Sequence, residues 1–360
     1  MLANFGIGTL AGWHVLMARR KILIVYAGGT IGMRAGPSGL VPSARFADDL
    51  VRWLGREPGL GACDFAVHLV EPLIDSAEAV PANWRAVARH IRFHHDGFDG
   101  VVVLHGTDTL TYTASALSFL LLGLGKPIIL TGAQVPFAFA GSDAEANIRG
   151  ALACAADGRI REVGICFDGV LLRGNRARKS SIHVGDGFES PHWPVLARLD
   201  GPRVIATDAL LRVDADRPPP AWPTAAADPV GLLKVYPGIS GRMIIGAADA
   251  HPSGLVLELY GSGTAPTLNW SVRDALAAIT ARKTPLVGVS QCVRGEIAPV
   301  PYASSRALHD AGVISGHDLT PEAALTKLTY LQGLRVPFEQ IGREMACPLA
   351  GELTPDPERA

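Results

Sequence analysis

The chain has 360 residues, of which 48% are hydrophobic and 19% charged, so it can fill more than one packed core. Its formal net charge of -1 lacks the basic excess typical of nucleic-acid-binding proteins, and we expect no nucleic-acid partner. Its five cysteines are widely spaced and show no metal-ligand spacing, which indicates reduced thiols and a cytoplasmic protein.

Residues 1–20 precede the first predicted strand, and we expect them to be an N-terminal extension outside the folded core. The stretch 1–16 is mildly apolar, but it lacks the basic start of a secretory signal and is too short to span a bilayer. We therefore expect no membrane association. Met17 begins "MARRKILIVYAGGT", which reads as a natural start of the chain, and an N-terminal peptide of the native protein would test this.

Apolar runs alternate with helix-like segments through the first half of the chain. Strands are predicted at 21–26, 65–73, 100–106 and 126–132, helices at 81–95, 112–124 and 142–156, and a hairpin at 162–174. Buried strands separated by helices are typical of a parallel sheet covered on both faces. We predict a larger N-terminal α/β domain over 21–211.

The proline-rich segment 212–229 breaks this periodicity and is predicted to link two domains. Beyond it, strand-like runs at 230–238, 254–261 and 285–292 alternate with helix-like runs at 271–283 and 321–334. We predict a smaller C-terminal α/β domain over 230–345 and a tail over 346–360.

Polar residues follow several of the predicted strands at the points where the strands end. They are Thr30, Asp75, Ser76, Thr107, Asp108 and Lys179. Because the carboxyl ends of parallel strands meet at one edge of an open sheet, we expect these side chains to converge. Taken singly, Thr30 could be a helix cap, Asp75 and Ser76 a turn pair, and Lys179 part of a solvated basic loop.

Together these residues fit acyl transfer on an amino-acid substrate. A threonine hydroxyl needs a neighbouring base to act as a nucleophile, and a desolvated lysine can supply one. The glycines before Thr30 let the backbone approach a ligand and turn N–H groups towards an oxyanion. Asp75 and Asp108 would repel phosphate but suit an ammonium group, which favours an amino acid over a nucleotide.

Six motifs carry a family resemblance: GGTIGM, GVVVLHGTDTL, KPIILTGAQVP, GNRARK, SQCVRGEI and GHDLTPEAALTKL. They resemble those of the bacterial L-asparaginases, specifically the type I cytoplasmic branch, and the resemblance runs from about Lys21 to 351–356. It implies a flavodoxin-like N-terminal domain, a smaller C-terminal α/β domain, and a homodimer or homotetramer. It also implies hydrolysis of L-asparagine to L-aspartate and ammonia without metal or cofactor.

The resemblance assigns roles to these residues. Thr30 would be the nucleophile that attacks the side-chain amide carbon, although the residues alone leave open which threonine attacks first. Lys179, beside Asp108, would help Thr107 act as a base, or would activate the water that hydrolyses the acyl-enzyme. The residues implied in substrate binding are Asp75, Ser76, Ala77, Thr107 and Asp108.

The sequence departs from the family pattern in several places. Ala27 stands where the family has a threonine before the two glycines, and Leu40 replaces a tyrosine of the following loop. Thr264 replaces the asparagine of a loop that reaches a neighbouring subunit, and it remains a possible cross-subunit contact. Arg178 and Glu258 replace the threonine and arginine of the type I allosteric pocket, so we expect a hyperbolic velocity curve in asparagine.

The histidines could indicate a metal site or a proton-transfer role, but their pattern supports neither. His90 and His94 are one helical turn apart, but the sequence shows no HExxH motif and places no further ligand nearby, so we expect no metal site. His95 directly follows His94 and does not extend the one-turn spacing of His90 and His94. His105 follows a strand directly and is predicted to orient the Thr107 loop rather than to transfer protons.

Three alternatives remain. The first is a glutaminase-asparaginase of the same fold. The second is the amidase subunit of a tRNA amidotransferase, which carries an N-terminal barrel that the short segment before Lys21 cannot form. The third is a non-catalytic amino-acid sensor, which the Leu40 replacement suggests but which would not need Thr30, Thr107 and Lys179.

Overall fold

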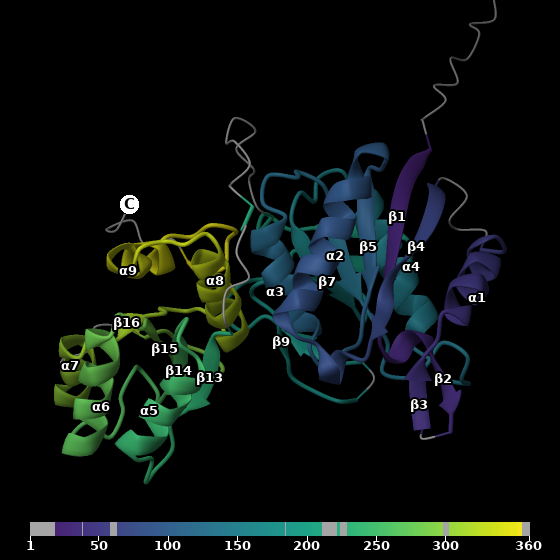
Figure 1. Ribbon diagram of the computed structural model, residues 1–360. Coiled ribbons are helices and arrows are strands. Elements are labelled where there is room, and N and C mark those ends of the chain that lie inside the picture. Colours follow the sequence, from purple (N-terminus) through teal and green to yellow (C-terminus); the bar gives the residue numbers. More distant parts are fainter. Residues whose placement is uncertain are drawn as a thin grey trace, which may run out of the picture.

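The computed structural model describes residues 19–37, 39–57, 63–183, 185–210, 222–223, 229–297 and 302–354. Most of the expected N-terminal extension, most of the predicted linker at 212–229 and the end of the predicted tail lie outside the described residues. Two α/β bodies stand side by side, the N-terminal one on the right of Figure 1 and the C-terminal one on the left.

The N-terminal body contains a sheet with the strand order β12-β11-β8-β7-β6-β5-β1-β4. Its strands are β1 (Arg20–Gly28), β4 (Cys63–Ile74), β5 (Gly100–Leu104), β6 (Ile128–Thr131), β7 (Val163–Phe167), β8 (Val170–Arg173), β11 (Ala197–Asp200) and β12 (Arg203–Ala206). The run β4-β1-β5-β6-β7 is parallel, whereas β8, β11 and β12 continue it antiparallel. The parallel run has the flavodoxin-like order 2-1-3-4-5, as the family resemblance implies.

Helices cover both faces of this sheet. Alternate residues of β1 enter different cores: Leu23 and Val25 pack with α2 (Pro81–His94) and α3 (Leu110–Leu120), whereas Ile22 and Ile24 pack with α1 (Arg45–Leu54) and α4 (Ala144–Ala156). A strand buried on both faces explains the continuous apolar run in the sequence. Helix α3 begins and ends earlier than the predicted 112–124.

The C-terminal body has a four-stranded parallel sheet in the order β13-β14-β15-β16. Its strands are β13 (Gly231–Lys234), β14 (Leu255–Leu259), β15 (Leu286–Ser290) and β16 (Ile314–Ser315), and its helices are α5 (Gly241–Ala250), α6 (Trp270–Ala281), α7 (Ala303–Asp310), α8 (Pro321–Gly333) and α9 (Phe338–Ala346). Helices α5, α6 and α7 share one core, and α8 packs towards the N-terminal body, where Ser115 and Thr326 share a hydrogen bond of 2.7 Å.

Short elements complete the fold. They are η1 (Thr30–Gly32), β2 (Met33–Gly36), β3 (Gly39–Pro42), η3 (Ser76–Glu78), η4 (His95–Gly97), β9 (Arg178–Lys179) and β10 (Phe188–Glu189). The β2–β3 hairpin lies beside α1, at the lower edge of the N-terminal body in Figure 1.

The segment 347–354 packs back onto the N-terminal body. Asn175 Nδ2 donates to the Ala350 carbonyl at 3.0 Å, and Arg176 Nε donates to the Gly351 carbonyl at 2.8 Å. The buried Glu352 pairs with the equally buried Lys327 of α8 at 2.6 Å. This part of the predicted tail is therefore part of the folded core.

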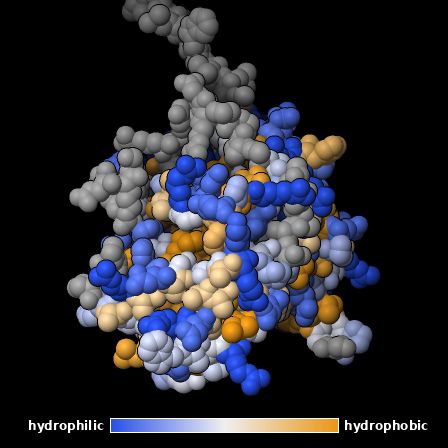
Figure 2. Space-filling model, turned by 60° about the vertical axis from the view of Figure 1, so that its left-hand side comes forward, coloured by the Kyte–Doolittle hydropathy of each residue, from blue (hydrophilic) through white to orange (hydrophobic). Residues whose placement is uncertain are grey.

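Among the described helices, none combines the length and the hydropathy needed to cross a bilayer. On the face seen in Figure 2, hydrophobic residues lie interspersed with hydrophilic ones.

Candidate active site

Thr30, Asp75, Ser76, Ala77, Thr107 and Asp108 follow β1, β4 and β5, which are neighbours in the sheet, whereas Lys179 lies in β9 and Thr264 in the C-terminal body. The chain leaves β1 for β4 on one side and then crosses to β5 on the other, so β1 and β5 mark the point where the strand order reverses. Ligands of open α/β sheets bind in the crevice that forms at this point, outside the carboxyl ends of the strands. Thr30, Asp75 and Thr107 all lie at this edge, which is the lower side of the sheet in Figure 1.

Glycines let the turns after these strands touch through their backbones. Gly29 has a φ of 86°, and a Cβ placed there would lie 2.1 Å from the backbone nitrogen of Gly106. A Cβ on Gly106 would lie 2.3 Å from Ser76 Oγ. Since no side chain fits at either position, the turns after β1, β4 and β5 form one interlocked unit.

The Gly29 N–H donates to the Ile74 carbonyl at 3.0 Å. It is therefore not available as the oxyanion donor expected from these glycines. The bond instead fixes the turn after β1 against the end of β4.

Thr30 is the first residue of η1 and is half-buried. The N-cap position belongs to Gly29, and no side-chain capping bond is made there. Across the ranges that the structure describes, the Thr30 hydroxyl has no hydrogen-bond partner, so it is not a helix cap. Its position leaves it able to meet a ligand at the switch point.

Thr107, Asp108 and Lys179 form a compact polar cluster. Lys179 Nζ donates to Thr107 Oγ1 at 3.0 Å and to Asp108 Oδ1 at 2.6 Å. Thr107 is buried, with 4% of its surface exposed, and its hydroxyl faces Gln134 Oε1 at 3.4 Å. Lys179 lies 72 residues from Thr107 and 71 residues from Asp108 in the sequence. Lys179 is in place to exchange a proton with the Thr107 hydroxyl.

Asp75 and Ser76 are held by local contacts. Asp75 Oδ1 accepts a hydrogen bond from the Ala77 N–H at 3.2 Å, and the Ser76 carbonyl accepts one from Thr109 Oγ1 at 2.8 Å. Ser76 is buried against the turn after β5. Asp75 therefore does stabilise a turn, which is the simpler role that the sequence allowed for it. The turn nevertheless lies beside the loop that carries Thr107.

His105 lies under the Thr107 loop. Its Nδ1 donates to the Gly106 carbonyl at 2.9 Å, and its Nε2 accepts from Thr113 Oγ1 at 3.1 Å. Burial lowers the pKa of His105, against the opposing effect of the Gly106 bond. Both ring nitrogens are engaged, so His105 connects the Gly106 carbonyl to Thr113, which supports the predicted role of orienting the loop.

The loop that carries Lys179 is anchored by buried arginines. Arg173 pairs with Glu162 at 2.6 Å, and the fully buried Arg176 pairs with Asp318 at 2.7 Å. Strand β9 then pairs Lys179 with Phe188 of β10. Lys179 therefore belongs to an ordered segment and not to a solvated basic loop.

Sequence reasoning missed Gln134 and the Arg176–Asp318 pair. Gln134 follows β6, so the rule that polar residues gather at strand ends could have identified it. Asp318 lies 142 positions from Arg176, and no local pattern signals this pairing.

The departures from the family pattern lie around the cluster rather than within it. Ala27 is fully buried in the core under α2 and α3, where a hydroxyl would need a partner. Leu40 pairs with Ala35 across the β2–β3 hairpin and is 44% exposed. Thr264 forms a single bridge with Tyr260 in the C-terminal body, and no described contact brings it to Thr107 or Lys179.

Arg178 and Glu258 belong to a second group of charges between the two bodies. Arg178 Nε lies 3.5 Å from Glu322 Oε2 at the start of α8. Burial raises the pKa of Glu322, Arg178 lowers it and Glu258 raises it. Burial, with help from Glu322 and Glu258, also raises the pKa of Tyr112 to about 12. Arg178 thus forms an ion pair with a carboxylate of its own chain. The absence of activation by asparagine stays a prediction.

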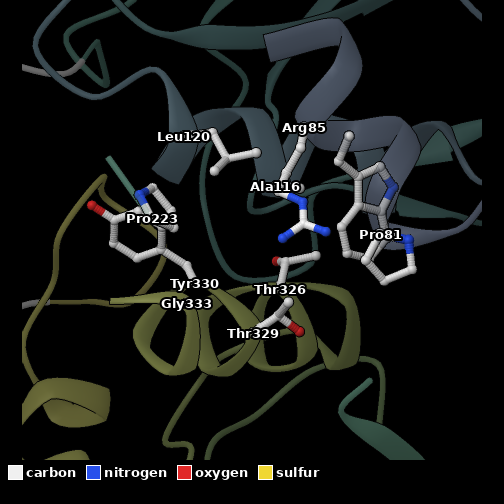
Figure 3. Close-up of a pocket in the computed structure, with 10 residues that line it drawn as sticks. Pro81, Arg85, Ala116, Leu120, Pro223, Thr326, Thr329, Tyr330 and Gly333 are labelled. Carbon is white, nitrogen blue, oxygen red and sulfur yellow. The ribbon is translucent and has the colours of Figure 1, made fainter. Parts of the chain in front are cut away.

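A separate pocket lies between α2, α3 and α8. Figure 3 shows Arg85, Ala116 and Leu120 facing Thr326 and Tyr330 across it. It contains none of the predicted site residues. The predicted site residues Thr107, Asp108 and Lys179 lie in the polar cluster at the strand ends and not in this mostly apolar pocket.

The expectation that no further ligand lies near His90 and His94 is wrong. Strand β4 brings His68 beside both rings of α2, so that one nitrogen of each ring lies within 4.8 Å of the others. Partial burial lowers the pKa of His68 and of His90, and the neighbouring His94 lowers both further. Sequence could not reveal this, because β4 and α2 are separate elements.

Comparisons with known proteins cover both bodies of the chain. The family model for the N-terminal domain of asparaginase matches residues 21–210, and the model for the glutaminase/asparaginase C-terminal domain matches residues 229–345. L-asparaginase 1 of Escherichia coli K12 is 39% identical over 94% of this chain and 100% of that protein. The human 60 kDa lysophospholipase is 36% identical over 93% of this chain and 62% of that protein. The crystal structure of L-asparaginase I from Vibrio cholerae has a TM-score of 0.80 and 37% identity, and covers 94% of this chain and all of that one.

Proposed function

Because the chain belongs to the asparaginase family of amidohydrolases, we propose that it is an L-asparaginase, which converts L-asparagine and water to L-aspartate and ammonia. The observation that carries this proposal is the contact of Lys179 with both Thr107 and Asp108 at the β1/β5 switch point. Thr30 follows the neighbouring strand with its hydroxyl unengaged by the described residues.

In the first step, Thr30 Oγ forms a bond to the side-chain amide carbon of asparagine. The C–N bond breaks, and the hydroxyl proton reaches the leaving nitrogen, which departs as ammonia. In the second step, a water molecule activated by Thr107 and Lys179 attacks the acyl-enzyme ester. The C–Oγ bond breaks, Thr30 recovers its proton and aspartate is released. No metal or cofactor is part of these steps.

Substrate binding would use the residues that surround the two threonines. Asp75 and Asp108 supply negative charge for the α-ammonium group. Asp75 follows β4 and Asp108 follows β5, the two strands on either side of β1. Ser76 and Thr107 offer short polar groups for the α-carboxylate, and Ala77 would contribute through the backbone N–H that donates to Asp75 Oδ1 in this structure. The requirement for both charged groups on the α-carbon of the substrate would select an amino acid over a simple amide.

We further propose a cytoplasmic homodimer or homotetramer. Thr264 stands in the loop that reaches a neighbouring subunit in the family, and it is half-buried in the single chain. A hydrogen bond from Thr264 to the partner's bound substrate would need the assembled oligomer.

The proposal is tested by ammonia release from L-asparagine, L-glutamine and D-asparagine, for the wild type, Thr30→Ala and Thr30→Ser. Loss of the nucleophile should lower kcat by about a thousandfold or more, and Thr30→Ser should keep part of the activity. Full activity in Thr30→Ala would refute the nucleophile assignment. A wild type that binds asparagine without releasing ammonia would instead be a sensor, and faster turnover of glutamine would make it a glutaminase.

A further inference from the structure

We propose that His68, His90 and His94 form a binding site for a divalent transition metal of the Zn²⁺ class. One nitrogen from each ring lies within 4.8 Å of the other two, and all three side chains are partly exposed. The site lies between β4 and α2 and shares no residue with the proposed asparaginase site. It therefore does not depend on the proposed function.

The spacing of the first two ligands fits a metal directly. Tetrahedral Zn²⁺ with Zn–N bonds of about 2.0–2.1 Å holds its nitrogen ligands about 3.3 Å apart. His68 Nδ1 and His90 Nε2 are 3.3 Å apart. The third nitrogen is within 4.8 Å, so a small rotation of one ring completes three corners of the tetrahedron.

The three imidazole rings are in mutual contact. The His68 ring stands at 88° to that of His90 and at 89° to that of His94 and meets both edge to face, whereas the His90 and His94 rings lie with their centroids 4.4 Å apart at an interplanar angle of 36°. His94 Nδ1 donates to the His90 carbonyl at 2.9 Å, which leaves Nε2 as the nitrogen with the lone pair. Metal-binding histidines commonly have their second nitrogen fixed in this way.

The elements hold the three residues in place before a metal binds. His90 and His94 share one face of α2 because they are one turn apart. His68 is paired in register with Val25 of β1, which fixes its position along the sheet. A preformed set of ligands lowers the cost of ordering side chains on binding.

The chemistry of the donors selects the metal. Imidazole nitrogen suits Zn²⁺, Cu²⁺ and Ni²⁺, whereas Mg²⁺ and Ca²⁺ prefer oxygen ligands, and the trio contains no carboxylate. Partial exposure leaves an entry path and room for a water molecule as the fourth ligand. Bound metal would join the last turns of α2 to β4, the strand at the edge of the sheet. His68 lies within β4, whereas Thr30 and Thr107 lie beyond the ends of β1 and β5. We therefore expect the bound metal to stabilise the fold and not to take part in the reaction.

The test is a calorimetric titration of the full, untagged chain with Zn²⁺ and, separately, with Mg²⁺. The exposed Cys292 and Cys347 are first changed to serine, since thiols could also bind Zn²⁺. We compare this parent with His68→Gln, which can still form hydrogen bonds. The matched control is His309→Gln, because the His309 side chain is 89% exposed and lies outside the trio.

We expect one Zn²⁺ per chain in the parent and in His309→Gln, a Kd raised at least about 100-fold in His68→Gln, and no Mg²⁺ binding. Bound Co²⁺ should give the strong visible absorption of four-coordinate geometry in the parent and not in His68→Gln. Zn²⁺ should raise the thermal unfolding midpoint of the parent but not that of His68→Gln. Ammonia release should be the same in both, with or without chelator.

Either of two results would overturn the proposal. If the parent binds no stoichiometric Zn²⁺, the three histidines form a hydrogen-bonded cluster only. If His68→Gln binds Zn²⁺ as tightly as the parent, the metal is held elsewhere. Equal unfolding midpoints of the metal-free parent and His68→Gln would show that any difference in affinity does not come from misfolding.

Discussion

Lys179 is the residue on which the chemistry of the polar cluster depends most directly. Its ammonium nitrogen contacts a hydroxyl and a carboxylate at once, and its side chain is 18% exposed, whereas that of Asp108 is 64% exposed. The carboxylate can thus face both Lys179 and an incoming ammonium group. The buried Thr107 hydroxyl accepts a hydrogen bond from Lys179 Nζ and donates one to Gln134 Oε1, so its orientation is fixed from both sides.

We predict that Lys179→Met lowers kcat for asparagine by about 10²- to 10⁴-fold with a smaller change in KM, because it removes the group that exchanges a proton with Thr107. Lys179→Arg should not restore activity, since a guanidinium does not release its proton in proteins. Steady-state ammonia release measures both effects. An active Lys179→Arg enzyme would show that only positive charge is needed at this position.

At the scale of elements, the site depends on how closely the turns after β1 and β5 approach each other. Positive φ at Gly29 is one requirement, and the absence of a side chain against Gly106 is another. Gly125 separates the two effects, because it also has a positive φ, of 62°, but would meet nothing within 4 Å if it carried a Cβ.

We predict that Gly125→Ala costs about 1–2 kcal/mol of unfolding free energy, from backbone strain alone, and leaves ammonia release unchanged. Gly29→Ala should cost more and abolish most activity, because its Cβ would push the Thr30 turn away from Gly106. Urea unfolding and ammonia release are the measurements. Equal losses in the two variants would argue against the interlocked turns.

On the scale of the whole molecule, Arg176 and Asp318 connect the two bodies. Asp318 accepts hydrogen bonds from Arg176 Nη1 at 2.7 Å and from Thr354 Oγ1 at 2.6 Å. Burial raises the pKa of Asp318, but Arg176 and Thr354 together outweigh it, and the net shift is downward. The same contacts hold the loop before Lys179, so the stability of the interface and the order of the site are linked.

We predict that Asp318→Asn lowers the unfolding free energy at neutral pH by about 3–5 kcal/mol, because Arg176 stays buried without its counter-charge. A carboxyl with a lowered folded-state pKa stabilises the fold above its unfolded pKa of about 3.9, and this contribution is lost as the pH falls through the folded value. The difference between wild type and Asp318→Asn should therefore be full at neutral pH and shrink below about pH 4.

The control for this prediction is Asp249→Asn. Asp249 pairs with Arg282 at 2.7 Å, but both side chains are about half exposed, at 53% and 50%. Its removal should cost at most about 1 kcal/mol. Urea unfolding curves over the pH range test both variants, and a similar loss in the two would contradict the role given to burial.

The sequence by itself determined the elements and the edge of the sheet that carries the polar residues. Strand β1 is buried on both faces, so its apolar run predicts a strand without knowledge of its neighbours. The polar residues at the strand ends indicate the candidate site. The short elements β2, β3 and β9 lack such a run, and their hairpin partners decide them.

Only the tertiary structure decided which distant side chains meet. In the folded chain Lys179 contacts Thr107, and the Gly29 N–H donates to the Ile74 carbonyl. Arg176 pairs with Asp318, and His68 lies beside His90 and His94. Each of these contacts joins separate elements, and periodicity describes only one element at a time. Their partners are fixed by strand order and by the packing of helices on the sheet, which no local pattern of residues contains.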